Sequence, residues 1–160
     1  MPSYLASYFR AEKQESALFI ALGLVAIVAA VAIWRLHPRY RAAAYPLVAI
    51  ALIQIGVGAS VYARTDRQVA ALVEQHRIDA GAFRSDEEAR MAKVMQNFQI
   101  YKAIEIAFVV VGATLAVFMR NRSSLAAIGV GCLIQGAVML VFDGFAESRG
   151  HTYIEAMRRE

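Results

Sequence analysis

The chain is poor in the residues and motifs on which most recognised protein chemistry depends. Its 160 residues include a single cysteine, Cys132, and three histidines. One cysteine cannot form an internal disulfide, and no Cys/His set has the spacing of a zinc site. The sequence also contains no GxSxG, HExxH, P-loop or dinucleotide-binding motif. These absences favour a protein that is not an enzyme.

Charged residues are also scarce, and their absence is concentrated in blocks. They make up 19% of the chain, whereas 59% is hydrophobic, and the mean hydropathy is +0.46. Residues 17–34, 42–62, 106–119 and 123–142 carry no charge. The third block reaches the length of a membrane span only if Glu105 is included. Because a bilayer core of about 30 Å needs about 20 helical residues, the four blocks predict four membrane spans.

We therefore predict an all-α integral membrane protein with one membrane domain, residues 1–160. It is a four-transmembrane-helix bundle with amphipathic helical extensions on one side, including a polar helical region of about 64–99. The first block is longer than the apolar core of a signal peptide, which has about 7–15 residues, so we treat it as a retained helix. The predicted spans are residues of about 16–35, 42–63, 100–119 and 123–143.

The segments outside the spans carry their own helix signals. In the N-terminal tail, Tyr4, Leu5, Tyr8 and Phe9 form one apolar face with aromatic anchors. This pattern predicts a short helix that lies in the membrane interface before the first span. The polar region between the second and third spans predicts two amphipathic helices with a break at residues 80–81.

Two capping boxes predict where these polar helices begin. Thr65 with Gln68, and Ser85 with Glu88, have the spacing that satisfies free amides at a helix start. From Ser85 onward one apolar face continues into the third span, so a single helix is predicted over residues 86–119. At about 1.5 Å per residue, such a helix extends well beyond the hydrocarbon core.

The net charge of +4 and the pI near 9.5 need no nucleic-acid partner. In a membrane protein, arginines mark loop placement and meet lipid phosphates. The two short connections, 35–41 and 120–122, hold arginines and no acid. Raw counting of Lys and Arg favours the other side, but translocating an Arg-only hairpin is the harder event. We therefore predict a multi-pass protein of the inner (plasma) membrane with these loops in the cytoplasm and both termini outside.

Ionisable residues gather at the membrane face that carries the termini. Glu105 lies about one turn inside the third span, where an ionised carboxylate needs a partner. It pairs either with Lys102 on the same helix or with Asp143 of the neighbouring helix. Two carboxyl groups placed in this way would share a proton or a cation, or bind an arginine of a partner. The predicted polar cluster consists of Arg64, Lys102, Glu105, Asp143, Glu147 and Arg149.

Three residues in this region have the spacing of a metal site. Asp143, Glu147 and His151 recur every fourth residue and would share one helix face. Carboxylate and imidazole ligands suit iron, manganese or zinc. However, Gly150 is a typical helix end and would turn His151 away, leaving the acids at the water boundary with Arg149 as counter-ion. We favour the second interpretation and predict no cofactor, with a divalent metal as the weaker alternative.

Two amides lie in the middle of predicted spans. Gln54 and Gln135 either hydrogen-bond between helices, as polar groups in lipid usually do, or line a path for a solute or ion. We favour the hydrogen bonds. Small residues spaced four apart predict close helix packing. The pairs are Ala26 with Ala30, Gly56 with Ser60, Gly112 with Ala116, and Ala127 with Gly131.

Three function classes follow from these patterns. The first is an interaction protein, either an accessory subunit of an envelope complex or an inhibitor or immunity-type protein, because the polar region and both tails together are rich in the Arg, Met and Tyr favoured at interfaces. The alternative is a small oligomeric transporter or channel that uses Glu105, Gln54 and Gln135. The second alternative is a metal-dependent membrane enzyme. The expected partners are the lipid bilayer and either further copies of the chain or another membrane protein.

Overall fold

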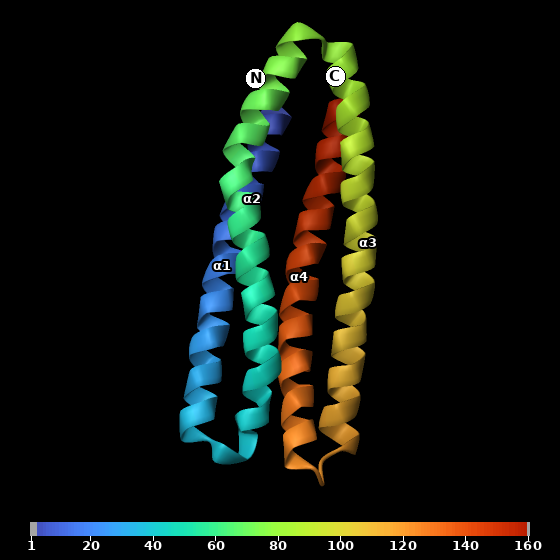
Figure 1. The fold of residues 1–160 in the computed structure, drawn as a ribbon. Helices are drawn as coiled ribbons and strands as arrows, with labels where there is room; N and C mark the ends of the chain where they lie inside the picture. The colour runs from blue at the N-terminus through green and yellow to red at the C-terminus, as the bar shows by residue number, and fades with distance from the viewer. Residues whose placement is uncertain (1–2, 160) are drawn as a thin grey trace.

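The computed structural model describes residues 3–159, which form four long α-helices and no strand (Figure 1). A short 3₁₀ helix, η1, begins at Pro38 and joins the first two helices. The element bounds are α1 Ser3–Leu36, η1 Pro38–Ala43, α2 Ala44–Ile78, α3 Ala80–Phe118 and α4 Ser123–Arg159.

The four helices run alternately down and up a single elongated bundle. Both termini and the α2–α3 turn lie at one end, and the α1–α2 and α3–α4 connections lie at the other (Figure 1). Each of the four helices contains a stretch that is long and apolar enough to cross a membrane. The prediction of an all-α fold with four helices of this kind is confirmed. We refer to the end that holds residues 3–15, 64–99 and 144–159 as the cap, and to the opposite end as the loop end.

The N-terminal tail does not form the separate interfacial helix that its apolar face predicted. α1 is continuous from Ser3 to Leu36, and nothing in its sequence breaks the helix between tail and span. The apolar face of the tail packs inside the protein instead. Tyr8 is 4% exposed, and its ring lies 4.5 Å from the ring of Tyr153 in α4.

The helix ends in the cap also differ from the predicted capping boxes. The break falls at Asp79, whose Oδ1 accepts a hydrogen bond from the Ala82 amide at 2.9 Å and so caps α3. Thr65 and Ser85 lie inside helices rather than at helix starts. Thr65 Oγ1 donates to the Val61 carbonyl one turn earlier, at 2.7 Å. The predicted continuous helix into the third span is present, but it begins at the Asp79 cap.

Gly150 does not end a helix, since α4 continues to Arg159. It is buried where α4 passes α3, and a Cβ at this position would lie 3.0 Å from the sulfur of Met95. Gly150 therefore allows close packing rather than a helix end. The cap around it has a large apolar core, consisting of Leu5, Tyr8, Phe9, Leu72, Phe83, Met91, Tyr153 and Met157.

The loop half of the bundle packs through small residues. A Cβ at Gly112 of α3 would lie 2.6 Å from the Leu133 amide nitrogen and 2.7 Å from the Gly129 carbonyl oxygen of α4. The helices thus meet backbone to backbone at this point, as the predicted small-residue spacing requires. The pair Gly56 and Ser60 was wrong: Gly56 faces open space, and Gly58 makes the close contact with α1.

The outer surface of the loop half carries large apolar side chains. Val28, Leu52, Val110 and Val141 are each more than half exposed. Contiguous apolar surface of this extent is rare on soluble monomers and fits contact with lipid. The two glutamines Gln54 and Gln135, by contrast, are buried inside the bundle.

Candidate functional site

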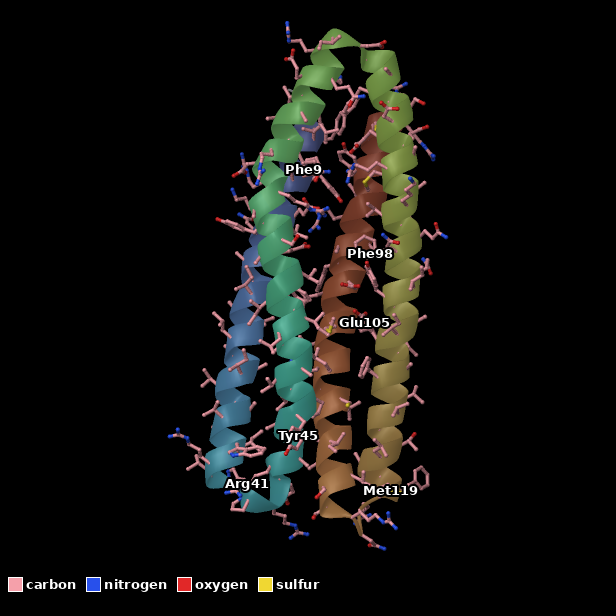
Figure 2. All side chains as sticks on the ribbon, in the orientation of Figure 1. Phe9, Arg41, Tyr45, Phe98, Glu105 and Met119 are labelled. Atoms are coloured by element: carbon pink, nitrogen blue, oxygen red, sulfur yellow. The ribbon has the colours of Figure 1, made fainter. Side chains whose placement is uncertain are left out.

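Glu105 of α3 lies inside the bundle, near the middle of its length (Figure 2). Its residue is 3% exposed. Its carboxyl group lies within hydrogen-bonding reach of the Asp143 carboxyl group on α4. α3 and α4 come close here because Gly136 of α4 has no side chain. A Cβ built at Gly136 would lie 3.3 Å from the Glu105 carbonyl oxygen of α3. The structure therefore brings together the two carboxyl groups that the sequence offered as one alternative.

The carboxyl groups of Glu105 and Asp143 can form a hydrogen bond with each other only through a proton on one of them. Glu105 Oε2 is buried and receives no hydrogen bond from residues 3–159. Two ionised carboxylates only accept hydrogen bonds and repel each other. A hydrogen bond between Glu105 and Asp143 therefore exists only when one of them carries a proton, as in other buried carboxyl pairs.

Lys102 does not neutralise Glu105 directly. Its ammonium group forms an ion pair with Glu147 of α4, and Gln99 donates a second hydrogen bond to Glu147 at 3.0 Å. The Lys102–Glu147 pair lies about one turn closer to the cap than Glu105 and Asp143. The alternative in which Lys102 pairs with Glu105 is thus replaced by an interhelical pair with Glu147.

Gln54 of α2 is the most enclosed polar side chain at this depth. It is 0% exposed, and neither atom of its amide group has a hydrogen-bond partner within the described chain. α2 and α4 run parallel, and Leu47 and Gln135, which touch, are 88 residues apart. The same offset puts Gln54 at the level of Phe142 and Asp143 along the bundle. α2 thus contributes an unpartnered amide at the level of the carboxyl pair.

Gln135 lies about two turns nearer the loop end and does have a partner. Its Nε2 donates to the Leu47 carbonyl of α2 at 3.5 Å, which is long for a hydrogen bond and therefore weak. The residue is 3% exposed. The predicted interhelical hydrogen bond is present for Gln135, whereas the described residues supply none for Gln54.

The remaining members of the predicted cluster lie apart from the carboxyl pair. Arg149 forms an ion pair with Glu15 of α1, and its guanidinium lies 5.3 Å from the centre of the Tyr8 ring. It is therefore not the counter-ion of Asp143. Arg64 is exposed on α2 and acts by its charge on Glu12 of α1.

The weak metal candidate is not assembled. Within residues 3–159, no group of three or more His, Cys, Asp or Glu side chains is placed to hold a metal ion. His151 is exposed on α4, and Glu147 is occupied by Lys102. Asp143 faces Glu105 rather than the other two candidates.

A buried carboxylate in the cap escaped the sequence analysis. Glu87 of α3 is 1% exposed. Arg90 donates two hydrogen bonds of 2.7 Å to its two oxygens, and the Tyr153 hydroxyl donates a third at 2.7 Å. Burial raises the pKa of Tyr153, which therefore stays a donor. The spacing of Glu87 and Arg90 is the local signal, but an exposed helix face looks the same in sequence.

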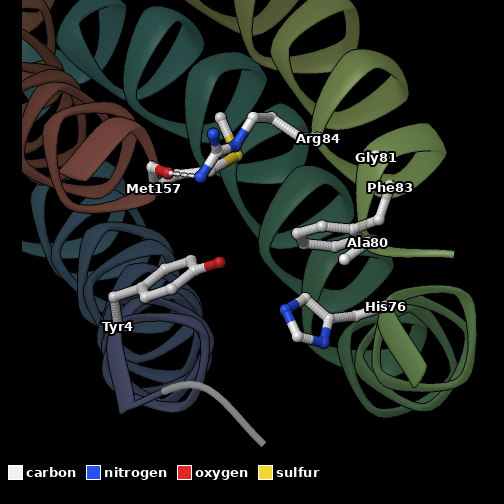
Figure 3. Close-up of a pocket in the computed structure, with 7 residues that line it drawn as sticks. All are labelled: Tyr4, His76, Ala80, Gly81, Phe83, Arg84 and Met157. Carbon is white, nitrogen blue, oxygen red and sulfur yellow. Dashed lines mark hydrogen bonds between the residues drawn. The ribbon is translucent and has the colours of Figure 1, made fainter. Parts of the chain in front are cut away.

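The tip of the cap holds a pocket of about 350 Å³. Figure 3 shows the Arg84 side chain reaching across it, where it donates to the Met157 carbonyl at 3.1 Å. On another wall the His76 ring packs edge-on against Phe83, with 5.0 Å between centroids. The pocket lining consists of Tyr4, His76, Ala80, Gly81, Phe83, Arg84 and Met157.

Comparisons with protein families, with curated proteins and with solved structures found no match. The fold by itself defines the class: an all-helical bundle whose four helices are long and apolar enough to cross a membrane. Inside this bundle the chain carries a carboxyl pair, formed by the buried Glu105 and the half-buried Asp143, and a Gln54 amide with no hydrogen-bond partner among the described residues.

Proposed function

We propose that the protein is a multi-pass membrane protein whose bundle interior binds a proton or a small cation, as a small transporter or channel does. The observation that carries this proposal is the Glu105–Asp143 pair. An ionisable side chain at membrane depth is costly, and such residues usually mark ion or proton pathways. Gln54, enclosed at the same level without a partner, adds a group that could hydrogen-bond a bound species.

The burial of the cap residues supports this class over the interaction protein. The Arg, Met and Tyr side chains of the cap, with the absence of catalytic motifs, were the reason to expect a binding surface there. Tyr8, Met91, Tyr153 and Met157 are all at most 4% exposed and form the core of the cap itself. These four side chains are therefore unavailable to a partner. Glu105 and Gln54, by contrast, have buried polar atoms that no hydrogen bond among the described residues uses.

An interaction protein remains the second candidate because of the pocket at the cap tip. Its walls include the rings of Tyr4 and Phe83 together with Arg84 and Met157, which are residue types enriched where partners bind. An accessory subunit or inhibitor would insert a side chain here. This candidate requires a partner that touches the cap from outside, where the chosen orientation places both termini.

Flux measurements in proteoliposomes test the proposal. The purified protein is reconstituted with a pH-sensitive dye inside, and proton, sodium and potassium flux are measured in parallel. Glu105→Gln and Asp143→Asn should each abolish flux of the transported species. Glu155→Gln, a matched change on the exposed surface of α4, should leave it unchanged.

Two results would count against the transporter or channel. One is the absence of flux in a preparation that is folded and correctly inserted. The other is flux that Glu105→Gln and Asp143→Asn leave at the wild-type rate.

A stoichiometric protein partner recovered from native membranes, and lost on Arg84→Ala, would favour the second candidate. The mass of the purified complex in detergent reports whether several copies assemble.

A further inference from the structure

The charges around the carboxyl pair are unbalanced when every acid is ionised. Lys102 on α3 is paired with Glu147 on α4, and its charge also acts on Glu105 and Asp143, so one cation faces three carboxyl groups. From the other two helices come neutral groups at this level: Gln54 on α2, and on α1 an aromatic ring, Phe19, whose centroid is 5.9 Å from that of Phe142. Two negative charges in contact here would be strongly unfavourable. At least one proton is needed.

The same surroundings are poorly suited to a metal cation. Hard metal ions usually take about six or more oxygen ligands, and membrane transporters obtain many of these from carbonyls of interrupted helices. Here α2, α3 and α4 are continuous through this level, so their carbonyls accept hydrogen bonds within the helices. The side chains offer two carboxyl groups and the amide of Gln54. A proton needs only two oxygens.

The route from the pair to water is short on the cap side. Lys102 and Glu147 lie one turn above the pair, and their side chains are 33% and 13% exposed. Gln99, which donates to Glu147, is exposed. Ionisable and polar groups therefore form a continuous series from the cap surface to Asp143, which is four residues from Glu147 on the same helix face.

On the loop side the helices approach one another backbone to backbone, beside an apolar pocket of about 290 Å³ lined by residues of α1, η1 and α4. Gly112 and Gly129 bring α3 against α4, with no space for a Cβ on either residue. A Cβ at Gly131 would lie 2.9 Å from the Ala43 carbonyl of η1, so α4 also lies directly on the connection between α1 and α2. Between these contacts and Glu105, the polar side chain of Gln135 is engaged with the Leu47 carbonyl.

Resting on the function proposed above, we infer that the ligand of the interior site is a proton, shared between Glu105 and Asp143. It exchanges with the cap side past Lys102 and Glu147, while the loop side is closed. The proton passes from water at the cap to one carboxylate of the pair, which then donates a hydrogen bond to the other. With this proton bound, the pair carries one negative charge in place of two that would repel each other.

Infrared difference spectroscopy detects such a proton. At neutral pH, exposed carboxyl groups are ionised, so a protonated-carboxyl band that shifts in heavy water reports a buried, protonated acid. We expect this band in the reconstituted wild type and its loss in both Glu105→Gln and Asp143→Asn. Glu155→Gln should retain it. Adding sodium or potassium at constant pH should leave the band unchanged, and its loss on adding either ion would overturn the assignment of a proton.

Sidedness is measured in vesicles sorted by the accessibility of a C-terminal tag. A rapid pH step outside cap-outward vesicles should change the band at once, whereas the same step outside loop-outward vesicles should act only after slow leakage. Glu147→Gln should slow the cap-side response without removing the band. A prompt response to the loop-side step would overturn the inferred route.

The two levels of proposal fail in different ways. If no protonated-carboxyl band depends on Glu105 or Asp143 in a correctly folded protein, the binding site itself is refuted, and the proposed function with it. If the band is present but responds to metal cations or to the loop side, the interior site stands and only the proton or its route is wrong. Melting temperatures of each variant in detergent show which preparations are folded.

Discussion

α3 and α4 meet backbone to backbone where Gly112 faces Gly129, and this contact supports a quantitative prediction. In Gly112→Ala, the new methyl carbon would lie 2.6 Å from the Leu133 nitrogen and 2.7 Å from the Gly129 oxygen. Ordinary contacts of a Cβ are 3.4–4 Å. Neither neighbour is the end of a flexible side chain, so the helices must separate by roughly 1 Å, with loss of packing along their length.

The expected cost of this separation is about 1–3 kcal/mol, the usual range for overpacking a close-packed interior. The measured loss of stability will be smaller than this steric cost, because alanine is a better helix former than glycine by about 1 kcal/mol. Gly56→Ala supplies the matched control. Gly56 also lies within a helix, and a Cβ there would meet nothing within 4 Å. The difference between the two variants therefore isolates the steric cost.

Unfolding in mixed micelles, followed by helical circular dichroism as the denaturing detergent increases, measures both variants on one scale. Gly112→Ala should be less stable than Gly56→Ala by about 1–3 kcal/mol, and Gly56→Ala should match or exceed the wild type. If Gly112→Ala were as stable as Gly56→Ala, the backbone contact between α3 and α4 would be refuted. The closure of the loop side inferred from that contact would then lose its basis.

Four further predictions concern the cap, the interior amides, pH and orientation. Tyr153→Phe should cost about 1.5–3 kcal/mol, since it removes a hydrogen bond to the charged Glu87. Gln135→Leu should lower stability by about 0.6 kcal/mol, whereas Gln54→Leu should not, because no partner is lost from the described residues; binding should suffer instead. Burial raises the pKa of the Glu12 carboxyl above its ordinary value of 4.5, so folding favours the protonated form and stability should fall as pH rises from 4.5 through the raised pKa. A periplasmic reporter at the C-terminus should be active, and one in the α1–α2 connection should be silent.

Each of these has its own control. Tyr101→Phe changes an exposed tyrosine and should leave stability unchanged; an equal loss in both variants would contradict the cap network. Equal destabilisation by the two glutamine variants would mean that Gln54 has a structural partner. Glu12→Gln should flatten the loss of stability above pH 4.5, and an unchanged profile would assign that loss to another acid. The reverse reporter pattern would invert the orientation but leave the interior site intact.

The number and order of the apolar helices followed from the sequence because their causes are local. Uncharged blocks of spanning length, separated by polar segments, are defined by hydropathy along the chain. Pro38 marks the first connection, and its φ and missing amide act within a turn. The pairing of Glu105 with Asp143 was also visible as one of two alternatives, because both residues fall at the same end of adjacent spans.

What the tertiary structure alone decided is which side of each helix faces the interior. Gly56 and Gly58 are two positions apart, yet one faces open space and the other packs on α1. Glu87 looked like any acid on a polar helix, but the rotation of α3 buries it against Tyr153. Thr65 had the spacing of a helix cap and lies inside a helix, because packing in the cap stabilises a longer helix than local signals do.

The interior site depends on the same choice. Whether Lys102 pairs with Glu105 or with Glu147 is decided by the register of α3 against α4, which no spacing within one helix determines. Gln54 and Gln135 looked equivalent in sequence, but only Gln135 lies opposite a carbonyl that it can reach. Hydropathy specifies how many apolar helices the chain forms. Helix rotation and register, set by close packing at glycines and by the cap core, specify which polar groups meet.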